Sequence, residues 1–168
     1  MNKYEDLFNA INGVIREFNE YLVEKCKIPE LHNSLTPLNR EGYIRFANDP
    51  KRGIYFIFGH SQENENESGV YIGKASVNST MGNRIRDHRR KYRTHHSDKI
   101  ICNDGRANPY VILEFATLEL ESPKPTHMIA SLEEFLISKL TGRINLINGT
   151  GNIACRKRGQ MGAGVPKI

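Results

Sequence analysis

Two short runs decide the fold, Gly53-Ile54-Tyr55-Phe56-Ile57-Phe58 and Gly69-Val70-Tyr71-Ile72-Gly73. Both runs are rich in β-branched and aromatic residues, the types that favour a pleated and partly buried strand. The polar, acidic stretch between them is typical of the connection in a β-hairpin. The sequence therefore predicts a hairpin that places Tyr55 and Tyr71 side by side on adjacent strands.

The chain before the hairpin contains one amphipathic pattern and one connector. Apolar residues recur at helical spacing over residues 4–26, and they predict an N-terminal helix with one buried face. Residues 27–52 contain three prolines, and they predict a connector that wraps the core.

The chain after the hairpin continues the same mixture of elements. We expect a charge-rich helix over residues 78–93, a polar loop over 94–109 and a third strand over 110–120. Thr126 can begin a helix that runs to about Leu140. The order predicts an α/β chain of the α+β type, with a small three-stranded antiparallel sheet flanked by helices and an added N-terminal helix.

Length and composition predict one domain over residues 1–168. The chain is 38% hydrophobic and 26% charged, which is ordinary for a globular protein large enough to bury a core. It has no membrane-length apolar run, no signal-peptide pattern and three widely spaced cysteines, so we expect a cytoplasmic location. We divide it into an N-terminal helix and connector (1–52), a core (53–145) and a basic, glycine-rich tail (146–168).

Positive charge is concentrated in two segments. The net charge is +5, Asp87 is the single acid between residues 84 and 93, and no acid follows Glu134. Such clustering is typical of proteins that bind a polyanion, although basic surfaces are also common without a partner. If a nucleic acid is the partner, we expect its backbone to be contacted by Arg86, Arg90, Arg93, Arg156, Lys157 and Arg158.

Arg84 and His88 lie one turn apart on the predicted helix 78–93, near its apolar face. A charged side chain directed toward a core is costly unless it has a partner, so the pair is a candidate functional site. The alternatives are an arginine that extends past the edge of the core and a histidine satisfied within it.

Glu133 and Lys74 are the next candidates. The helical neighbours of Glu133 are more apolar than those of Glu134, so Glu133 is predicted to be half-buried and Glu134 solvated. A carboxylate in that position can hold Mg²⁺ together with water and phosphate oxygens, or it can form a structural ion pair with an arginine. Lys74 directly follows Tyr71-Ile72-Gly73 and can reach the same site or remain in solvent.

Together these residues resemble the GIY-YIG nuclease family. Gly53-Ile54-Tyr55 is similar to its first motif and Tyr71-Ile72-Gly73 to its second. The resemblance runs from Gly53 to about Asn145. It implies that Tyr55 is the catalytic tyrosine, Tyr71 a second functional tyrosine and Arg84 the helix arginine. It further implies that Glu133 binds the metal and that Asn145 is the late asparagine, with Asn148 and Asn152 as nearby alternatives.

Within that family the chain is most similar to the small type II restriction endonucleases, which add a histidine at the position of His88. The resemblance implies a site-specific endodeoxyribonuclease that uses one Mg²⁺ or Mn²⁺ per active site and acts on double-stranded DNA as a homodimer. The alternatives are a homing or repair nuclease of the same family, and a catalytically silent DNA-binding module.

In the mechanism implied by this resemblance, Tyr55 is the general base for the attacking water. Arg84 binds the phosphate oxygens, and Glu133 holds the ion that stabilises the leaving 3′-oxygen. We expect nearby positive charge to lower the pKa of Tyr55 from its usual value of about 10. Tyr71, Lys74 and His88 would assist the water. In a rival assignment His88 is the base and Tyr55 only donates a hydrogen bond.

Overall fold

The computed structural model describes residues 4–31, 35–38, 51–61, 64–76, 79–92, 100–102, 110–119 and 126–148. The N-terminal helix is present as predicted. Helix α1 runs over Glu5–Tyr21 and continues into a π-helical turn, Leu22–Cys26. Its buried positions repeat at helical spacing and are Leu7, Ile11, Val14, Ile15 and Phe18. The helical segment ends at Lys27, which adopts the left-handed conformation with a φ of 57°.

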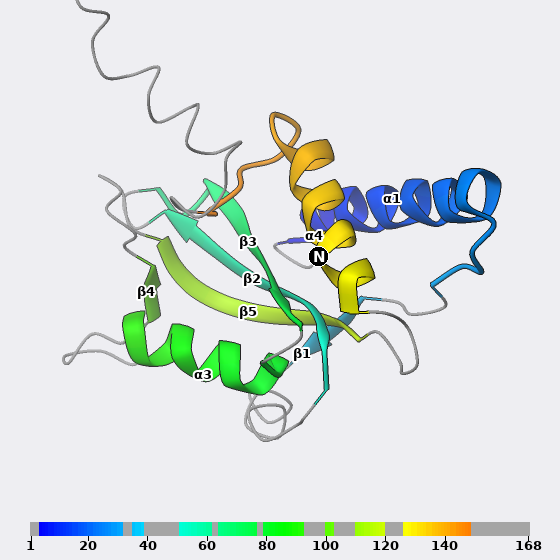
Figure 1. Cartoon of the computed structure of the whole chain (residues 1–168). Coiled ribbons are helices and arrows are strands. Elements are labelled where there is room, and N and C mark those ends of the chain that lie inside the picture. Colours follow the sequence, from blue (N-terminus) through cyan, green and yellow to red (C-terminus); the bar gives the residue numbers. More distant parts are fainter. Residues whose placement is uncertain are drawn as a thin grey trace, which may run out of the picture.

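The predicted hairpin forms the centre of a sheet. Strand β2, Gly53–Ser61, pairs antiparallel with strand β3, Ser68–Ala75, and on its other side with strand β5, Tyr110–Glu119. These three long strands and the helices around them confirm the α+β class (Figure 1). β2 is therefore the central strand, and β3 is an outer one.

Two further strands of three residues each extend the sheet beyond the prediction. β1, Thr36–Leu38, and β4, Ile100–Cys102, both pair antiparallel with the outer edge of β5. β1 falls within the predicted connector 27–52 and β4 within the predicted loop 94–109, so both predictions were wrong at these positions. Segments this short carry too little alternation to predict a strand, whereas the unpaired edge of β5 offers backbone partners to any extended segment beside it.

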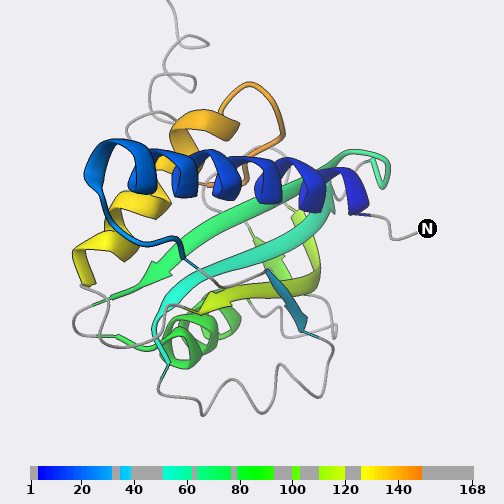
Figure 2. The same cartoon turned by 90° about the vertical axis from the view of Figure 1, so that its right-hand side faces the viewer.

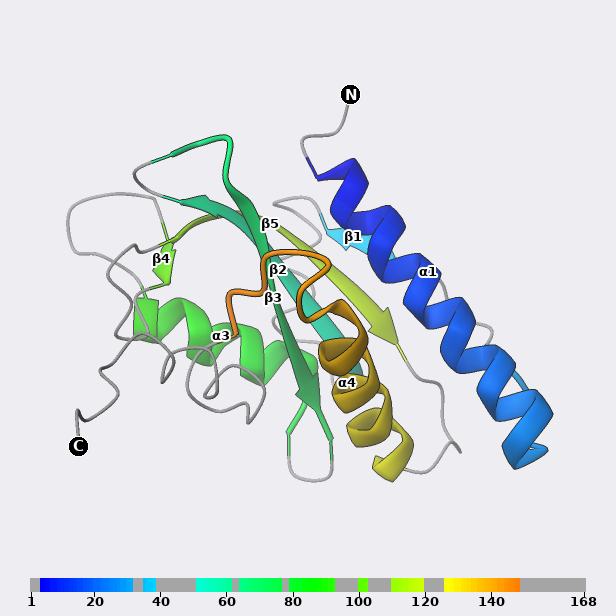
Figure 3. The same ribbon diagram turned by 90° about the horizontal axis from the view of Figure 1, so that it is seen from above.

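Helices cover both faces of the sheet. α1 and α4, Thr126–Leu140, lie on one face, and α3, Met81–Tyr92, lies on the other (Figures 1, 2 and 3). Each of the described helices is too short or too polar to cross a membrane. The sheet therefore separates α3 from the other two helices.

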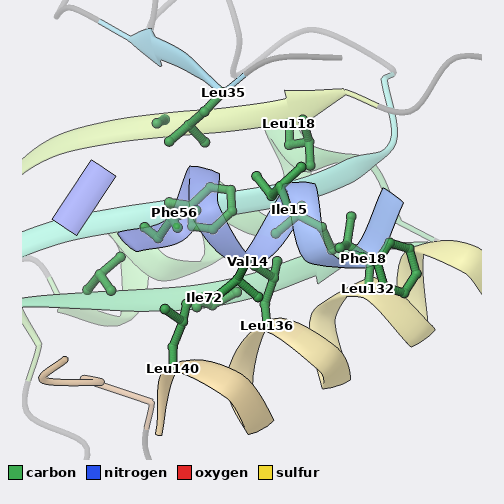
Figure 4. Packing of buried hydrophobic residues seen from close by; sticks show 14 of the residues in the cluster. Val14, Ile15, Phe18, Leu35, Phe56, Ile72, Leu118, Leu132, Leu136 and Leu140 are labelled. Atoms are coloured by element: carbon green, nitrogen blue, oxygen red, sulfur yellow. The ribbon is translucent and has the colours of Figure 1, made fainter. Parts of the chain in front are cut away.

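The hydrophobic core fills the space between the sheet and the pair α1 and α4. Phe56 and Ile72 project from neighbouring strands toward Val14 of α1 and Leu136 of α4 (Figure 4). Because side chains alternate along a strand, the neighbours of Phe56 and Ile72 face the opposite side, toward α3. Tyr55, Tyr71 and Gly73 therefore share the α3 face.

After α4 the chain returns to the outer edge of β3. The amide of Val70 donates to the carbonyl of Asn145 at 3.0 Å, and the amide of Ile147 donates to the carbonyl of Val70 at 2.8 Å. Val70 and Leu146 thus form a parallel bridge. This return satisfies backbone groups that would otherwise stay open at the edge of the sheet.

Candidate active site

The two motif tyrosines meet on the α3 face, as the hairpin predicted. Tyr55 is opposite Gly73 in the register of β2 and β3, and Tyr71 is opposite Ile57. The two tyrosines are therefore diagonal neighbours, and their rings stack with centroids 6.2 Å apart and planes inclined by 26°. Diagonal neighbours on one face are within reach of each other when both side chains are long and aromatic.

Gly73 makes this stacking possible. A Cβ at that position would lie 2.3 Å from the Tyr55 Cζ atom and 2.4 Å from its hydroxyl oxygen. The Tyr55 ring therefore lies directly across the backbone of Gly73, in the space that any other side chain would occupy. Gly53, at the start of the first motif, has a φ of 153°, which L-residues rarely adopt. Glycine is therefore required at both positions, at Gly73 by the space that the Tyr55 ring fills and at Gly53 by the backbone conformation.

The two tyrosines differ in burial. Tyr55 is 0% exposed, whereas Tyr71 is half-buried. Tyr55 lies on the central strand, with β3 on one side and β5 on the other, while Tyr71 lies on an outer strand. A central position leaves an aromatic side chain few routes to solvent.

The pKa of Tyr55 is raised, and this corrects the expectation that it would be lowered. Burial is the largest cause because it penalises the phenolate, and the neighbouring Tyr71 hydroxyl adds to the increase. The charge and hydrogen bond of Arg84 act in the opposite direction but do not outweigh burial. Tyr55 therefore holds its proton more firmly than a free tyrosine.

Arg84 is brought to both tyrosines by the first turn of α3. The amide of Met81 donates to the carbonyl of Lys51 at 2.9 Å, and the Thr80 hydroxyl accepts from the amide of Asn83 at 3.2 Å. These contacts fix the start of the helix beside the entry to β2. Arg84 is largely exposed, yet its guanidinium interacts with Tyr55 and Tyr71, and the pKa of Arg84 is raised mainly by Tyr55.

Glu133 forms an ion pair with Lys74. The Lys74 ammonium lies 2.7 Å from the Glu133 Oε2 atom, and the two side chains are 39% and 18% exposed. Glu134 is exposed, which confirms the predicted contrast between the two carboxylates. The alternative prediction for Glu133 was a structural ion pair with an arginine. The observed ion pair is with Lys74.

The site residues thus form two clusters that share strand β3. Tyr55, Tyr71 and Arg84 form the tyrosine cluster on the α3 face. Lys74 and Glu133 form the ion-pair cluster beside α4, because Lys74 alternates with Gly73 along the strand.

Glu133 offers a carboxylate, the ligand type that hard divalent cations take, and a cation bound there would have to displace the Lys74 ammonium. Within the described ranges no group of three or more His, Cys, Asp or Glu side chains converges to hold a metal. A cation at Glu133 would therefore take its remaining oxygen ligands from water and from a phosphate, which is common for Mg²⁺. The residues present fit such an ion.

The late asparagines differ sharply in their surroundings. The Asn145 side chain donates to Glu67 Oε1 at 3.2 Å, and this contact is exposed. Asn148 is buried, accepts from the Ile72 amide at 2.9 Å and donates to the Ile72 carbonyl at 2.6 Å. The side-chain amide of Asn148 thus bonds to Ile72 in the way that a paired backbone residue would, next to the bridge between Val70 and Leu146. Asn148 therefore fixes the backbone of Ile72 in the second motif. No sequence pattern indicated this role.

Several predicted DNA contacts lie outside the described part of the protein. The side chains of His88 and Arg90, and all of Arg93 and residues 156–158, are outside it. Arg86 is described; it is exposed on α3 and donates a hydrogen bond to Asn83.

Comparisons with protein-family models, with curated proteins and with solved structures each found no match for this chain. The resemblance to the GIY-YIG family therefore depends on the motif residues and their arrangement.

Proposed function

We propose that this protein is a divalent-metal-dependent DNA endonuclease of the GIY-YIG type, acting as a site-specific restriction enzyme. One observation carries the proposal: two tyrosines and an arginine from three separate elements gather on one face of the sheet. A purely structural sheet would not need a guanidinium beside two phenol groups at the same place. Each of the three also occupies the matching position of a family motif.

The tyrosine cluster suits hydrolysis of a phosphodiester. The Arg84 guanidinium can bind the non-bridging oxygens of the phosphate and stabilise the charge that develops on them. A phenol oxygen next to it can take a proton from an attacking water. Binding and activation would then occur within one group of contacting side chains.

The ion-pair cluster supplies the remaining requirement, a carboxylate for a cation. Glu133 would hold Mg²⁺ or Mn²⁺, which when bound neutralises charge on the leaving 3′-oxygen. Lys74, released from Glu133, could then contact the phosphate. Both clusters belong to β3, so a DNA strand that passes along the Gly73–Ala75 end of this outer strand is the arrangement we propose.

Charge supports DNA as the partner. The net charge is +5, and Arg86, which follows Arg84 by two residues on α3, is exposed. The specificity expected of a restriction enzyme would come from a homodimer on a symmetric double-stranded site.

The first test replaces each of two neighbouring glutamates with alanine. Glu133→Ala should abolish cleavage and leave DNA binding largely intact, because affinity comes mainly from phosphate contacts elsewhere. Glu134→Ala is the matched control, since Glu134 is exposed on the same helix. Plasmid cleavage and gel-shift binding would be measured with both variants.

The outcomes separate the possible functions. Discrete bands from the wild type, lost only in Glu133→Ala, support a site-specific metal-dependent nuclease. Binding without cleavage by the wild type would leave a silent DNA-binding module. Full cleavage by Glu133→Ala, or loss only in Glu134→Ala, would contradict the assignment of the metal ligand.

A further inference from the structure

We propose that Lys74 is the resident counter-ion of Glu133 in the absence of DNA, and that it transfers to a DNA phosphate when a divalent cation takes its place at Glu133. Binding of the cation and binding of DNA then reinforce each other, so the site is loaded on the substrate rather than in free solution. This inference rests on the proposed nuclease function and names a regulation of the same site.

The first ground is the surroundings of Glu133. Its side chain is 18% exposed, and its neighbours on α4, Leu132 and Leu136, are completely buried. A carboxylate in such a place is costly unless a positive charge compensates it. The Lys74 ammonium, 2.7 Å from the Oε2 atom of Glu133, supplies that charge from the neighbouring strand.

The second ground is the number of charges that can meet at this point. Among the residues that the structure describes, no group of three or more His, Cys, Asp or Glu side chains converges. Glu133 therefore has no such group beside it to neutralise an ammonium and a divalent cation at the same time. Two cations held against one carboxylate repel each other, and the repulsion is stronger away from bulk water. The ammonium and the divalent cation are therefore alternatives at Glu133.

The third ground is the ease of the exchange. Lys74 is the more exposed partner at 39%, and its backbone is held opposite Ile54 in the register of β2 and β3. Helix α4, which carries Glu133, packs beside β3 (Figure 3). A lysine ammonium is strongly hydrated and sits on a flexible four-carbon stem. The exchange therefore needs only rotation of the Lys74 side chain toward solvent, with the strand and the helix left in place.

Coupling between the two ligands follows from this exchange. A phosphate beside the end of β3 attracts the Lys74 ammonium away from Glu133, and the carboxylate left behind favours a cation. Because linkage is reciprocal, a cation at Glu133 releases Lys74 and strengthens DNA binding by the same factor. The exchange moves one side chain and makes or breaks no covalent bond.

The first experiment measures Mn²⁺ binding to the protein without DNA, from the electron paramagnetic resonance signal of unbound Mn²⁺. Lys74→Met removes the ammonium but keeps a long side chain. The Mn²⁺ dissociation constant should fall by roughly 10-fold to 100-fold, the size expected for loss of a competing hydrogen bond between charged groups. Lys74→Arg keeps the positive charge and should bind Mn²⁺ no more tightly than the wild type. Equal dissociation constants for Lys74→Met and the wild type, or binding by neither, would overturn the inference.

Lys139 supplies the matched control on the same helix. Its ammonium lies 2.9 Å from the Glu17 Oε2 atom, and the two side chains of this pair are 47% and 38% exposed. Lys139→Met removes one positive charge by the same substitution and should leave Mn²⁺ binding unchanged. Adding Glu133→Gln to Lys74→Met should abolish the gain, which assigns the ion to Glu133. An equal gain in Lys139→Met would mean that net charge, and not exchange at Glu133, sets the affinity.

The second experiment measures the coupling with DNA. Gel shifts use a labelled fragment that the wild type cuts, with and without Mn²⁺, in proteins that also carry Tyr55→Phe so that the fragment is not cut. Mn²⁺ should tighten DNA binding more when Lys74 is present than in the Lys74→Met variant, because only the lysine transfers from carboxylate to phosphate. Equal tightening in both proteins would overturn the coupling.

The two levels of proposal fail in different ways. If the wild type cuts no DNA but Lys74→Met gains Mn²⁺ affinity through Glu133, the nuclease function is wrong and the exchange at Glu133 stands. If DNA is cut but Lys74→Met gains no Mn²⁺ affinity, the function stands and Lys74 is not the competitor of the cation.

Discussion

The two faces of the sheet differ in what their side chains do. On the face covered by α1 and α4, residues such as Phe56 and Leu136 are completely buried and contact other apolar groups. On the face covered by α3, the buried groups include a phenol that interacts with a second phenol and a guanidinium. One face therefore stabilises the fold, while the other holds polar groups in a costly environment, which is common at functional sites.

The largest expected effect is loss of stability on the apolar face. Leu136→Ala removes a fully buried side chain between α4 and the sheet and should lower the free energy of unfolding by about 2–5 kcal/mol. Chemical denaturation measures this, with the exposed Ser138→Ala as control. DNA cleavage by the fraction that remains folded should be unchanged. A folded but inactive Leu136→Ala protein would remove the distinction between the faces.

The next effect belongs to the polar face. Gly73→Ala would place a Cβ 2.3 Å from the Tyr55 Cζ atom, and this contact cannot be relieved without moving the ring or the strand. We expect a loss of about 1–3 kcal/mol in stability, as for overpacking, together with a loss of cleavage far beyond the unfolded fraction. Near-UV circular dichroism and cleavage assays would be compared. Normal cleavage by Gly73→Ala would show that the position of Tyr55 is unimportant.

The raised pKa of Tyr55 predicts a pH dependence of stability. Below a pH of about 10 both the folded and the unfolded states keep the proton, so this residue contributes no slope. Above about 10 the unfolded chain loses the proton while the folded protein retains it, and stability should fall by about 1.4 kcal/mol per pH unit. The decline should continue until the pH passes the folded pKa.

Denaturation of the wild type and of Tyr55→Phe across this range isolates that contribution. The variant should lack the part of the slope that Tyr55 causes. Tyr21→Phe is the control, because Tyr21 is 51% exposed and its replacement should leave the slope unchanged. Equal slopes for the wild type and Tyr55→Phe would mean that Tyr55 ionises freely in the folded protein.

The smallest expected effect is a stabilisation at Gly13, which contrasts with Gly73 because it has free space around its Cα atom. Gly13 lies inside α1, and a Cβ there would meet no atom within 4 Å. Gly13→Ala should raise the free energy of unfolding by about 0.5–1 kcal/mol, because alanine restricts the unfolded chain and favours the helix. Thermal denaturation measures the gain, and cleavage should not change. Destabilisation would indicate a contact of Gly13 that the helix geometry does not reveal.

The sequence alone determined the periodic parts of this protein. Regular alternation and helical spacing predicted α1, the hairpin of β2 and β3, strand β5 and helix α4. These patterns are local, because burial of one face of a helix or strand repeats with a fixed period. The same local reasoning separated Glu133 from Glu134.

Only the tertiary structure decided the contacts between distant segments. β1 and β4 exist because the edge of β5 offers partners, and Asn148 is buried because its side chain bonds to Ile72. The depth of Tyr55 follows from its place on the central strand and from Gly73 beside it. Burial depends on which elements come together in space, and the pKa of a phenol depends on burial, so neither could be read from the motifs.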